Sequence, residues 1–310
     1  MYFYTAERKL MGCRFRLGLV HQNSEQAVEL IEIGIREIKR IEDLLSEFKP
    51  DSENTLINQH AGQKAVRISE ETFSLIMRSN AISRLSQGTF DISAKSLKNL
   101  YSFKNSHFNF PAENIIKEAL DKVGYENIEL SETDKSVKFN AKGMQISFAA
   151  IGKGYASDRV KHLWLELGVT AGFIDASGDL NAFGNKPDGN PFTVGIANPE
   201  NPSQSLFQIP IENVAIATSG DYEQHFTYQG KRYSHNINPH TGKPLTGLKS
   251  VSFVAPSAEL ADALATAVYV MGPERGLTFV EQLPQTHCVI IDEKNKTYFS
   301  SHISYNTINH

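Results

Sequence analysis

Apolar side chains recur every three or four positions between residues 24 and 48, with Glu, Lys and Arg between them. This spacing places one apolar stripe along a long amphipathic helix. We expect Ser24 to cap its N-terminus, because a Ser side chain accepts a hydrogen bond from a free N–H of the first turn. The stripe consists of Val28, Ile31, Ile35, Ile38, Ile41 and Leu45.

Similar patterns predict three further helices. One begins after Ser69 and stops near Gly88, and another runs from about residue 154 to 167 and ends at Gly168. A third spans residues 258–271 before Gly272-Pro273. Glycine ends helices readily because it adopts the left-handed conformation without a Cβ clash.

Strand patterns fill the second half of the chain. Residues 144–148 alternate apolar and polar, and residues 192–196, 214–218 and 251–254 are rich in β-branched or aromatic side chains. Strands and helices mix without a regular βαβ order, which favours an α+β fold with mixed or antiparallel sheets flanked by helices over a doubly wound parallel sheet. No clean boundary divides the chain, so we predict one domain over residues 1–310.

Composition narrows the classes of function. The chain of 310 residues has a formal net charge of −4, with Lys and Arg scattered along it. Nucleic-acid binding is not expected, because it needs basic residues gathered in patches. No stretch approaches the ~20 apolar residues of a membrane span. Cys13 and Cys288 form neither a disulfide framework nor a thiolate metal site.

The first residues lack the basic-then-apolar order of a secretory signal, and no Cys follows an apolar stretch as a lipid anchor requires. A cytoplasmic location is therefore expected. The alternative is a periplasmic or membrane-associated protein whose leader is missing from this sequence.

One predicted helix carries candidate metal ligands. Asp262 and Thr266 are four residues apart, hence about one turn apart on the same face. A carboxylate and a hydroxyl are hard oxygen ligands of the kind that Mg²⁺ takes. In the alternative interpretation Asp262 makes a local cap or salt bridge and Thr266 bonds back to a carbonyl. The spacing alone does not separate the two.

Two glycine-containing segments are candidate ligand sites. Ala149-Ala-Ile-Gly-Lys-Gly-Tyr-Ala-Ser-Asp joins a predicted strand to a predicted helix, so backbone N–H groups and Lys153 could meet a phosphate. A tight turn would use the same glycines, and without other context that interpretation is favoured. In Gly88-Thr-Phe-Asp, Asp91 either caps a turn or joins Thr89 in binding a polar ligand around buried Phe90.

Two histidines are candidate general bases. His235 and His240 lie in Ser234-His-Asn-Ile-Asn-Pro-His-Thr-Gly-Lys-Pro, close in sequence to Thr218-Ser-Gly-Asp-Tyr. Histidine titrates near neutral pH and can activate a hydroxyl. A histidine in a turn is more often a hydrogen-bonded surface residue, so the pattern alone favours that interpretation. The chain has no Gly-x-Ser-x-Gly, His-Glu-x-x-His or Gly-x-Gly-x-x-Gly motif after a strand, which removes support for serine hydrolases, zincins and Rossmann dehydrogenases.

Taken together, the motifs follow the order found in a known family. They are Met11-Gly, Gly88-Thr-Phe-Asp, Ile151-Gly-Lys-Gly-Tyr-Ala-Ser-Asp, Ser177-Gly-Asp-Leu, Ala217-Thr-Ser-Gly-Asp-Tyr, His235-Asn-Ile-Asn-Pro-His-Thr-Gly-Lys-Pro and Ala261-Asp-Ala-Leu-Ala-Thr. This series resembles the ApbE family over nearly the whole chain. The resemblance implies an α+β fold with FAD in a cleft and Mg²⁺ at its pyrophosphate. It further implies FAD:protein FMN transferase activity, in which FMN passes to a Thr or Ser hydroxyl of an acceptor flavoprotein and AMP is released.

The resemblance also implies roles for individual residues. His235 corresponds to the family's catalytic histidine, which takes the proton from the acceptor hydroxyl. The metal ligands implied are Ala150 through its carbonyl, Asp262 and Thr266. The implied FAD contacts are Met11, Phe48, Thr89, Phe90, Asp91, Lys153 and Leu245.

Four positions depart from the family pattern. Ser147 and Asn238 stand where Asp is common, Ser177 replaces a Gly, and Gly152 replaces a common Ala. The two missing carboxylates either weaken Mg²⁺ binding or redirect proton transfer, or they mark a subgroup with the same activity. The alternatives to the transferase are therefore a Mg²⁺-dependent FAD pyrophosphatase, which would use water as the acceptor, and a non-catalytic FAD-binding protein.

Overall fold

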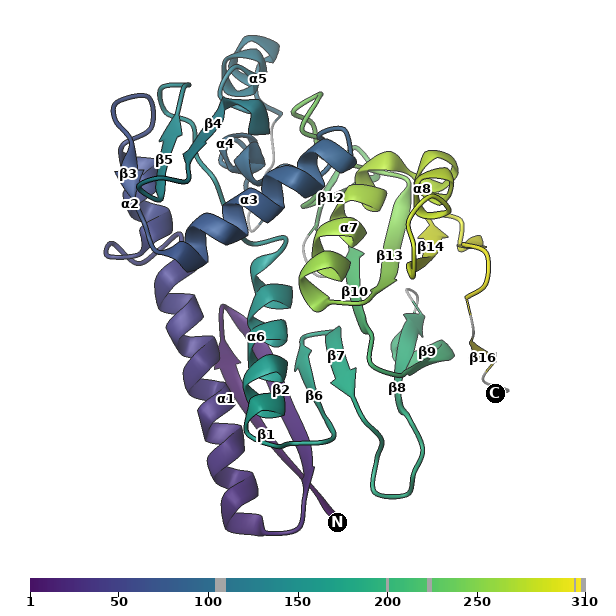
Figure 1. The fold of residues 1–310 in the computed structure, drawn as a ribbon. Coiled ribbons are helices and arrows are strands. Elements are labelled where there is room, and N and C mark those ends of the chain that lie inside the picture. The colour runs from purple at the N-terminus through teal and green to yellow at the C-terminus, as the bar shows by residue number, and fades with distance from the viewer. Residues whose placement is uncertain (104–109, 199–200, 222–224, 304, 308–310) are drawn as a thin grey trace.

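The computed structural model describes residues 1–103, 110–198, 201–221, 225–303 and 305–307. Within these ranges the main sheet is built from β1 (Tyr2–Leu10), β2 (Cys13–His21), β6 (Gly172–Ala176), β7 (Asp179–Phe183), β10 (Ala215–Gly220), β13 (Leu248–Ala255), β14 (His287–Asp292) and β15 (Thr297–Phe299). The strands lie in the order β1-β2-β6-β7-β10-β13-β14-β15, and each neighbouring pair is antiparallel (Figure 1).

Smaller sheets flank the main one. They are formed by β3 (Val66–Arg67), β4 (Ile128–Ser131) and β5 (Ser136–Phe139), by β8 (Phe192–Asn198), β9 (Asn201–Ile211) and β16 (Asn306–Thr307), and by the hairpin of β11 (His225–Tyr228) and β12 (Lys231–Ser234). The described strand pairings within these sheets are antiparallel as well. The α+β prediction is confirmed, and the single domain over residues 1–310 stays a prediction.

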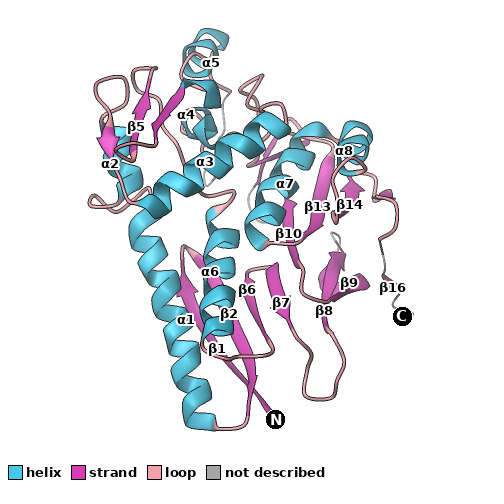
Figure 2. Cartoon of the chain, viewed as in Figure 1, coloured by secondary structure: helices cyan, strands magenta, loops and turns pink. Residues whose placement is uncertain are grey.

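Figure 2 shows the helices in cyan and the strands in magenta. They are α1 (Ser24–Leu45), α2 (Glu53–Gln59), α3 (Glu70–Leu85), α4 (Lys95–Lys98), α5 (Glu113–Leu120), α6 (Gly152–Glu166), α7 (Ala258–Met271) and α8 (Pro273–Val280), with short 3₁₀ turns at Ile92–Ala94 and Tyr125–Asn127. Across the described ranges no helix combines the length and apolar character that crossing a bilayer would require.

The central strands of the main sheet are apolar on both faces. Helices α1, α6 and α7 pack on one face, and β8 and β9 lie over part of the other. Side chains alternate between the faces, as the pleat of a strand requires. In β10, for example, Ala215 and Ala217 join the helix-side core, whereas Ile216 joins the core under β8 and β9. The sheet is thereby held between two layers.

The predicted long helix is present, with a different cap. α1 ends at Leu45, and Asn23 rather than Ser24 caps it, its side chain accepting a hydrogen bond of 2.9 Å from Gln26 N. Val28 of the predicted stripe is 57% exposed, while Ala27 and Gly34 are buried. The helix is therefore rotated slightly from the predicted stripe, because small residues also permit close packing against the sheet.

The other helix predictions are confirmed. Ser69 caps α3, which ends at Leu85, and α7 spans the predicted residues with Ser257 as its cap. α6 begins two residues before the predicted start and ends just before Gly168, whose φ of 82° lies in the left-handed region.

The predicted strand at residues 144–148 is wrong. Its alternation is real, since Met144, Ile146 and Phe148 are buried. The backbone nevertheless does not pair with a neighbouring strand. The Asn58 side chain accepts from Ile146 N at 2.8 Å and donates to Ile146 O at 3.0 Å, and Ser147 N donates to Ile92 O at 2.9 Å. A Ser96 hydroxyl similarly accepts from Gln145 N at 3.1 Å. Residues 144–148 therefore alternate between buried and more exposed side chains without pairing as a strand.

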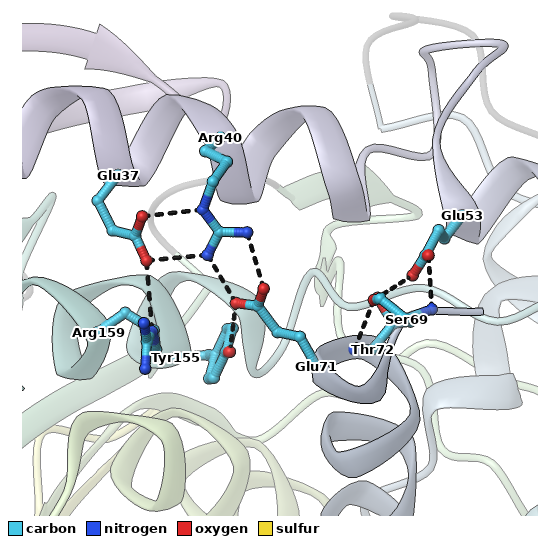
Figure 3. Close-up of polar contacts among 8 residues, drawn as sticks. All are labelled: Glu37, Arg40, Glu53, Ser69, Glu71, Thr72, Tyr155 and Arg159. Carbon is cyan, nitrogen blue, oxygen red and sulfur yellow. Dashed lines mark hydrogen bonds and ion pairs between the residues drawn. The ribbon is translucent and has the colours of Figure 1, made fainter. Parts of the chain in front are cut away.

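A network of charged side chains joins α1, α3 and α6 (Figure 3). Arg40 forms two hydrogen bonds with Glu37, of 2.8 and 2.9 Å, and two with Glu71, of 2.7 and 2.8 Å. From α6, Tyr155 donates to Glu71 at 2.6 Å and Arg159 donates to Glu37 at 3.3 Å. We call these five residues the Arg40 network. It fixes α6 against the other two helices.

Candidate active site

Two adjoining pockets form one cleft in the described part of the chain. Both are lined by Lys98, Ala149, Ala150, Asn236 and Thr266. The Asp91 pocket extends from these shared residues to Thr89, Phe90, Asp91, Ile92, Ala94, Lys95, Ser147, Ile237 and Pro239. The Asp262 pocket extends to Lys153, Thr218, Ser219, Gly220, His235 and Asp262. The cleft thus collects most of the predicted site residues from segments far apart in sequence.

Gly154, the second glycine of the predicted strand-to-helix motif, lets α6 pack closely against α7. A Cβ on Gly154 would lie 2.2 Å from the carbonyl oxygen of Ala258, a distance that no real Cβ contact allows. Gly154 N also donates to Asp262 Oδ2 at 3.3 Å. The glycine is required for close helix packing, and that packing sets where Asp262 lies.

Asp158 strengthens the same contact. Its carboxylate accepts hydrogen bonds from Ala258 N at 2.9 Å, Glu259 N at 2.8 Å and Asn181 Nδ2 at 2.6 Å. Burial raises the pKa of Asp158 to about 6, against the lowering effect of the two backbone N–H groups. Asp158 therefore holds the first turn of α7 against α6, a role that its place in the motif did not reveal.

Asp262 and Thr266 lie in one pocket, as their spacing on the helix requires. Asp262 is only 6% exposed, and Thr266 is half-buried with its Oγ1 3.2 Å from Ser219 Oγ. Ser257, not Asp262, supplies the side-chain cap of α7. Asp262 therefore does not cap its own helix, and the rest of the alternative interpretation stays untested. Ser219 is a neighbour that the sequence did not single out for this position.

Lys153 is held in the cleft by a buried carboxylate. Its Nζ lies 2.8 Å from Asp179 Oδ2, and Asp179 is 4% exposed. The other oxygen of Asp179 accepts from Thr218 N at 3.0 Å. The Ser-Gly-Asp-Leu motif thus orients Lys153 from β7 through an ion pair.

The structure separates the two candidate histidines. His235 follows β12 directly, is half-buried and lines the Asp262 pocket. Leu245 lies beside this segment, accepting from Ser234 N at 2.8 Å and donating to Asn236 O at 3.0 Å. His240 is exposed and lines a different hollow beside Gly88. Only His235 shares a pocket with Asp262 and Thr266 among the described histidines.

The Thr89-Phe90-Asp91 segment forms one wall of the Asp91 pocket. Phe90 is 1% exposed and belongs to the main core. Asp91 accepts hydrogen bonds from Ser93 N at 2.8 Å, Ser93 Oγ at 2.6 Å and Tyr125 N at 2.9 Å, so it does cap a turn. Burial raises its pKa. Capping and lining the cleft are thus combined in one residue.

The remaining predicted FAD contacts lie outside these two pockets. Met11 and Gly12 form the two-residue turn between β1 and β2, with φ of 49° and 76°. Met11 Cε is 3.6 Å from where a Cβ on Gly152 would be, so Met11 lies beside the first residue of α6. Phe48 is 85% exposed. Flavin contacts by Met11, Phe48 and Leu245 stay predictions, as do those by the predicted contacts that line the cleft.

The departures from the family pattern have local explanations. Ser177 has a φ of 58°, and its hydroxyl exchanges hydrogen bonds of 3.1 Å with the backbone N–H and carbonyl of Arg14. Asn238 Oδ1 accepts from His240 N at 2.9 Å and so shapes its own turn. Ser147 Oγ accepts from Ala149 N at 3.2 Å. Ser147 alone of these three lines the cleft.

The cleft offers oxygen ligands for a hard cation. No group of three or more His, Cys, Asp or Glu side chains among the described residues is arranged to hold a metal ion. The donors available are the carboxylate of Asp262, the hydroxyl of Thr266 and the carbonyl of Ala150, which all belong to residues of one pocket. One carboxylate with neutral oxygens fits Mg²⁺, which keeps places for substrate phosphates, better than it fits a closed zinc site.

Comparison with known proteins agrees with this arrangement. Residues 11–290 match the model of the ApbE family. The FAD:protein FMN transferase of Vibrio cholerae is 29% identical over 301 residues, which cover 94% of this chain and 89% of that protein. A protein of the same name from Klebsiella pneumoniae is 28% identical over 300 residues, covering 96% and 92%.

Solved structures show the same fold. The ApbE protein of Thermotoga maritima superposes with a TM-score of 0.89 at 31% identity, and 97% of each chain is covered. The flavin transferase ApbE from Vibrio cholerae superposes with a TM-score of 0.85 at 26% identity, again over 97% of both chains. This chain therefore belongs to the ApbE family and is a transferase.

Proposed function

We propose that this chain is a Mg²⁺-dependent FAD:protein FMN transferase that acts on a Thr or Ser hydroxyl of an acceptor flavoprotein. The hydroxyl oxygen forms a bond to the phosphorus of the FMN half. The bond from that phosphorus to the bridging oxygen breaks, and AMP leaves with that oxygen. The observation that supports this proposal is a single pocket that gathers Asp262, Thr266, Lys153 and His235.

His235 is the group that takes the proton from the acceptor hydroxyl. It is half-buried, lines the Asp262 pocket and directly follows β12. A neutral imidazole has one ring nitrogen without a proton, and that nitrogen can accept the proton of a hydroxyl. A nearby hydroxyl oxygen then becomes a better nucleophile.

Lys153 and the start of α6 bind phosphate oxygens. α6 begins at Gly152, so the positive end of its macrodipole lies beside the pocket that Lys153 lines. The ion pair with Asp179 limits the positions of the ammonium. An anion bound here is therefore oriented by a fixed charge rather than by a mobile surface lysine.

The residues that would hold Mg²⁺ are Asp262, Thr266 and Ala150 through its carbonyl. When bound, the ion neutralises charge on the pyrophosphate and on the departing AMP. The chain's contribution is to fix the two side chains on one turn of α7. Docking of α6 through Gly154 then places that turn in the cleft.

The test is incubation with FAD and Mg²⁺, with and without an acceptor peptide carrying a flavinylation motif on a carrier protein. Covalent FMN is read by mass and AMP by chromatography, with Asp262→Ala as the control. Acceptor-dependent covalent FMN that disappears in the control supports the transferase. AMP without a modified acceptor would instead point to the pyrophosphatase, and bound FAD with neither product to a binding protein.

A further inference from the structure

Lys98, the last residue of α4, occupies the junction of the cleft. It lines both the Asp91 pocket and the Asp262 pocket. A ligand that extends from one pocket into the other must pass the residues that the two share. Lys98 is the cationic side chain in that shared set. The motif analysis did not single it out.

The other two lysines of the cleft have carboxylate partners. Lys95 Nζ lies 3.0 Å from Glu47 Oε2, and Lys153 Nζ lies 2.8 Å from Asp179 Oδ2. Within the residues that the structure describes, Lys98 has neither a side-chain hydrogen bond nor an ion pair of this kind. Its ammonium is thus available to a ligand in a way that the other two are not.

The surroundings of Lys98 favour an added negative charge. Burial lowers the pKa of Lys98, and the neighbouring Lys95 and Lys153 act in the same direction, against Glu47 and Asp262. A partly buried ammonium without a partner is unfavourable, because it loses water without gaining a counter-charge. A bound anion would supply that charge.

We propose that Lys98 binds a phosphate oxygen of the dinucleotide at the junction of the two pockets. The identity of the nucleotide as FAD rests on the proposed function. The geometry assigns Lys98 a binding role rather than a structural one, because Glu47, a carboxylate whose charge acts on Lys98, is already paired with Lys95. Lys98 and Lys153 then contact the anionic part of the ligand from two segments, α4 and α6.

The test compares FAD affinity in four proteins: the wild type, Lys98→Met, Lys98→Arg and Lys95→Met. Methionine keeps an unbranched apolar stem and removes the charge, and arginine keeps the charge. Lys95→Met is the matched control, because it removes a lysine from the same wall whose charge already has a partner. Dissociation constants are measured by quenching of flavin fluorescence in EDTA, so that FAD is not turned over, at low and at high salt.

We expect Lys98→Met to raise the dissociation constant for FAD about tenfold at low salt, as loss of one charge-assisted contact predicts. The difference should shrink at high salt, because screening weakens the contact in the wild type. Lys98→Arg should stay within threefold of the wild type, and Lys95→Met should change less than Lys98→Met. Thermal unfolding without flavin should be similar in all four proteins.

An unchanged dissociation constant in Lys98→Met would overturn the inference. So would an equal loss of affinity at both salt concentrations or in Lys95→Met, or no binding of FAD by the wild type. Failure of the proposed function looks different. If the wild type binds FAD through Lys98 with the expected salt dependence but never forms covalent FMN, the Lys98 assignment stands and the transferase proposal fails.

Discussion

Arg40 in its network and Lys98 in the cleft are cations in opposite surroundings. In the network Arg40 is bonded to Glu37 and Glu71, and each carboxylate receives a further hydrogen bond from α6. In the cleft Lys95 and Lys153 have carboxylate partners, whereas Lys98 has none among the described residues. Matched charges join helices, whereas a cation without a partner marks a place where a ligand supplies the opposite charge. Substitutions in the cleft should therefore change mainly activity or FAD affinity, and substitutions in the Arg40 network should change mainly the free energy of unfolding.

The largest effect is expected on the cleft side. His235→Ala should lower the rate of FMN transfer by about 10²–10⁴-fold, the usual contribution of a general base. FAD affinity and the unfolding temperature should change little, because His235 is one of several residues that line the pocket and is only half-buried. Rates come from covalent FMN formed over time. An unchanged transfer rate would remove His235 from the mechanism.

Gly154→Ala should break the contact that positions the cleft. Its new Cβ would meet the Ala258 carbonyl at 2.2 Å, so α6 and α7 must separate. We expect a loss of about 2–3 kcal/mol in the free energy of unfolding, as for other overpacked sites. Transfer activity should also fall, because Asp262 moves with α7. Urea denaturation measures the first effect.

The control for that substitution lies on the same helix. In Gly152→Ala the nearest atom, Phe148 Cβ, is 3.4 Å from the new methyl, which is ordinary contact. The free energy of unfolding of this variant should stay within about 0.5 kcal/mol of the wild type, since the new methyl meets no clash although Gly152 is buried. Equal losses in the two variants would contradict the assignment of Gly154 to helix packing.

The site illustrates which features a sequence can predict. Asp262 and Thr266 were placed together from spacing alone, because a helix converts a four-residue interval into one face. The Ser69 cap of α3 and the bounds of α7 could be predicted for the same reason, since both depend on residues adjacent in sequence. The Arg40 network and Lys98 were not found, because their partners, or their lack of them, depend on helices that approach from distant parts of the chain.

The errors have the same physical origin. Residues 144–148 show the alternation of a strand, but only the folded chain reveals that Asn58 and Ser96 take the backbone hydrogen bonds that a neighbouring strand would make. For Asp158, the sequence shows an acidic residue on α6. It gives no sign that the N–H groups at the start of α7 donate hydrogen bonds to this residue. Patterning reports which side of a segment is buried, and it does not report what lies against that side.

On the scaffold side, Arg40→Met should lower the free energy of unfolding by about 2 kcal/mol. The substitution leaves Glu37 and Glu71 without their main partner, and charge-assisted hydrogen bonds are worth more than neutral ones. The loss in free energy is not larger, because the Arg40 side chain is 46% exposed and solvent screens its charge. FAD affinity should change less than in Lys98→Met.

Arg8→Met serves as the control, since Arg8 and Glu32 form an ion pair in which the side chains are 51% and 39% exposed. That pair should contribute less than about 0.5 kcal/mol. If Arg8→Met and Arg40→Met were equally destabilising, the Arg40 network would have no special part in joining the helices.

The smallest expected effect is a change in pH dependence. The hydrogen bonds from Arg40, ahead of the one from Tyr155, hold the pKa of Glu71 below its ordinary value of 4.5, although burial opposes them. A carboxyl with a lowered folded pKa stabilises the protein above its unfolded pKa, and this contribution is lost as pH falls through the folded value. The free energy of unfolding, measured in urea between pH 6 and pH 3, should therefore fall less steeply in Glu71→Gln than in the wild type. The exposed Glu118→Gln should keep the wild-type slope, and a wild-type slope in Glu71→Gln would show that its charge is not coupled to folding.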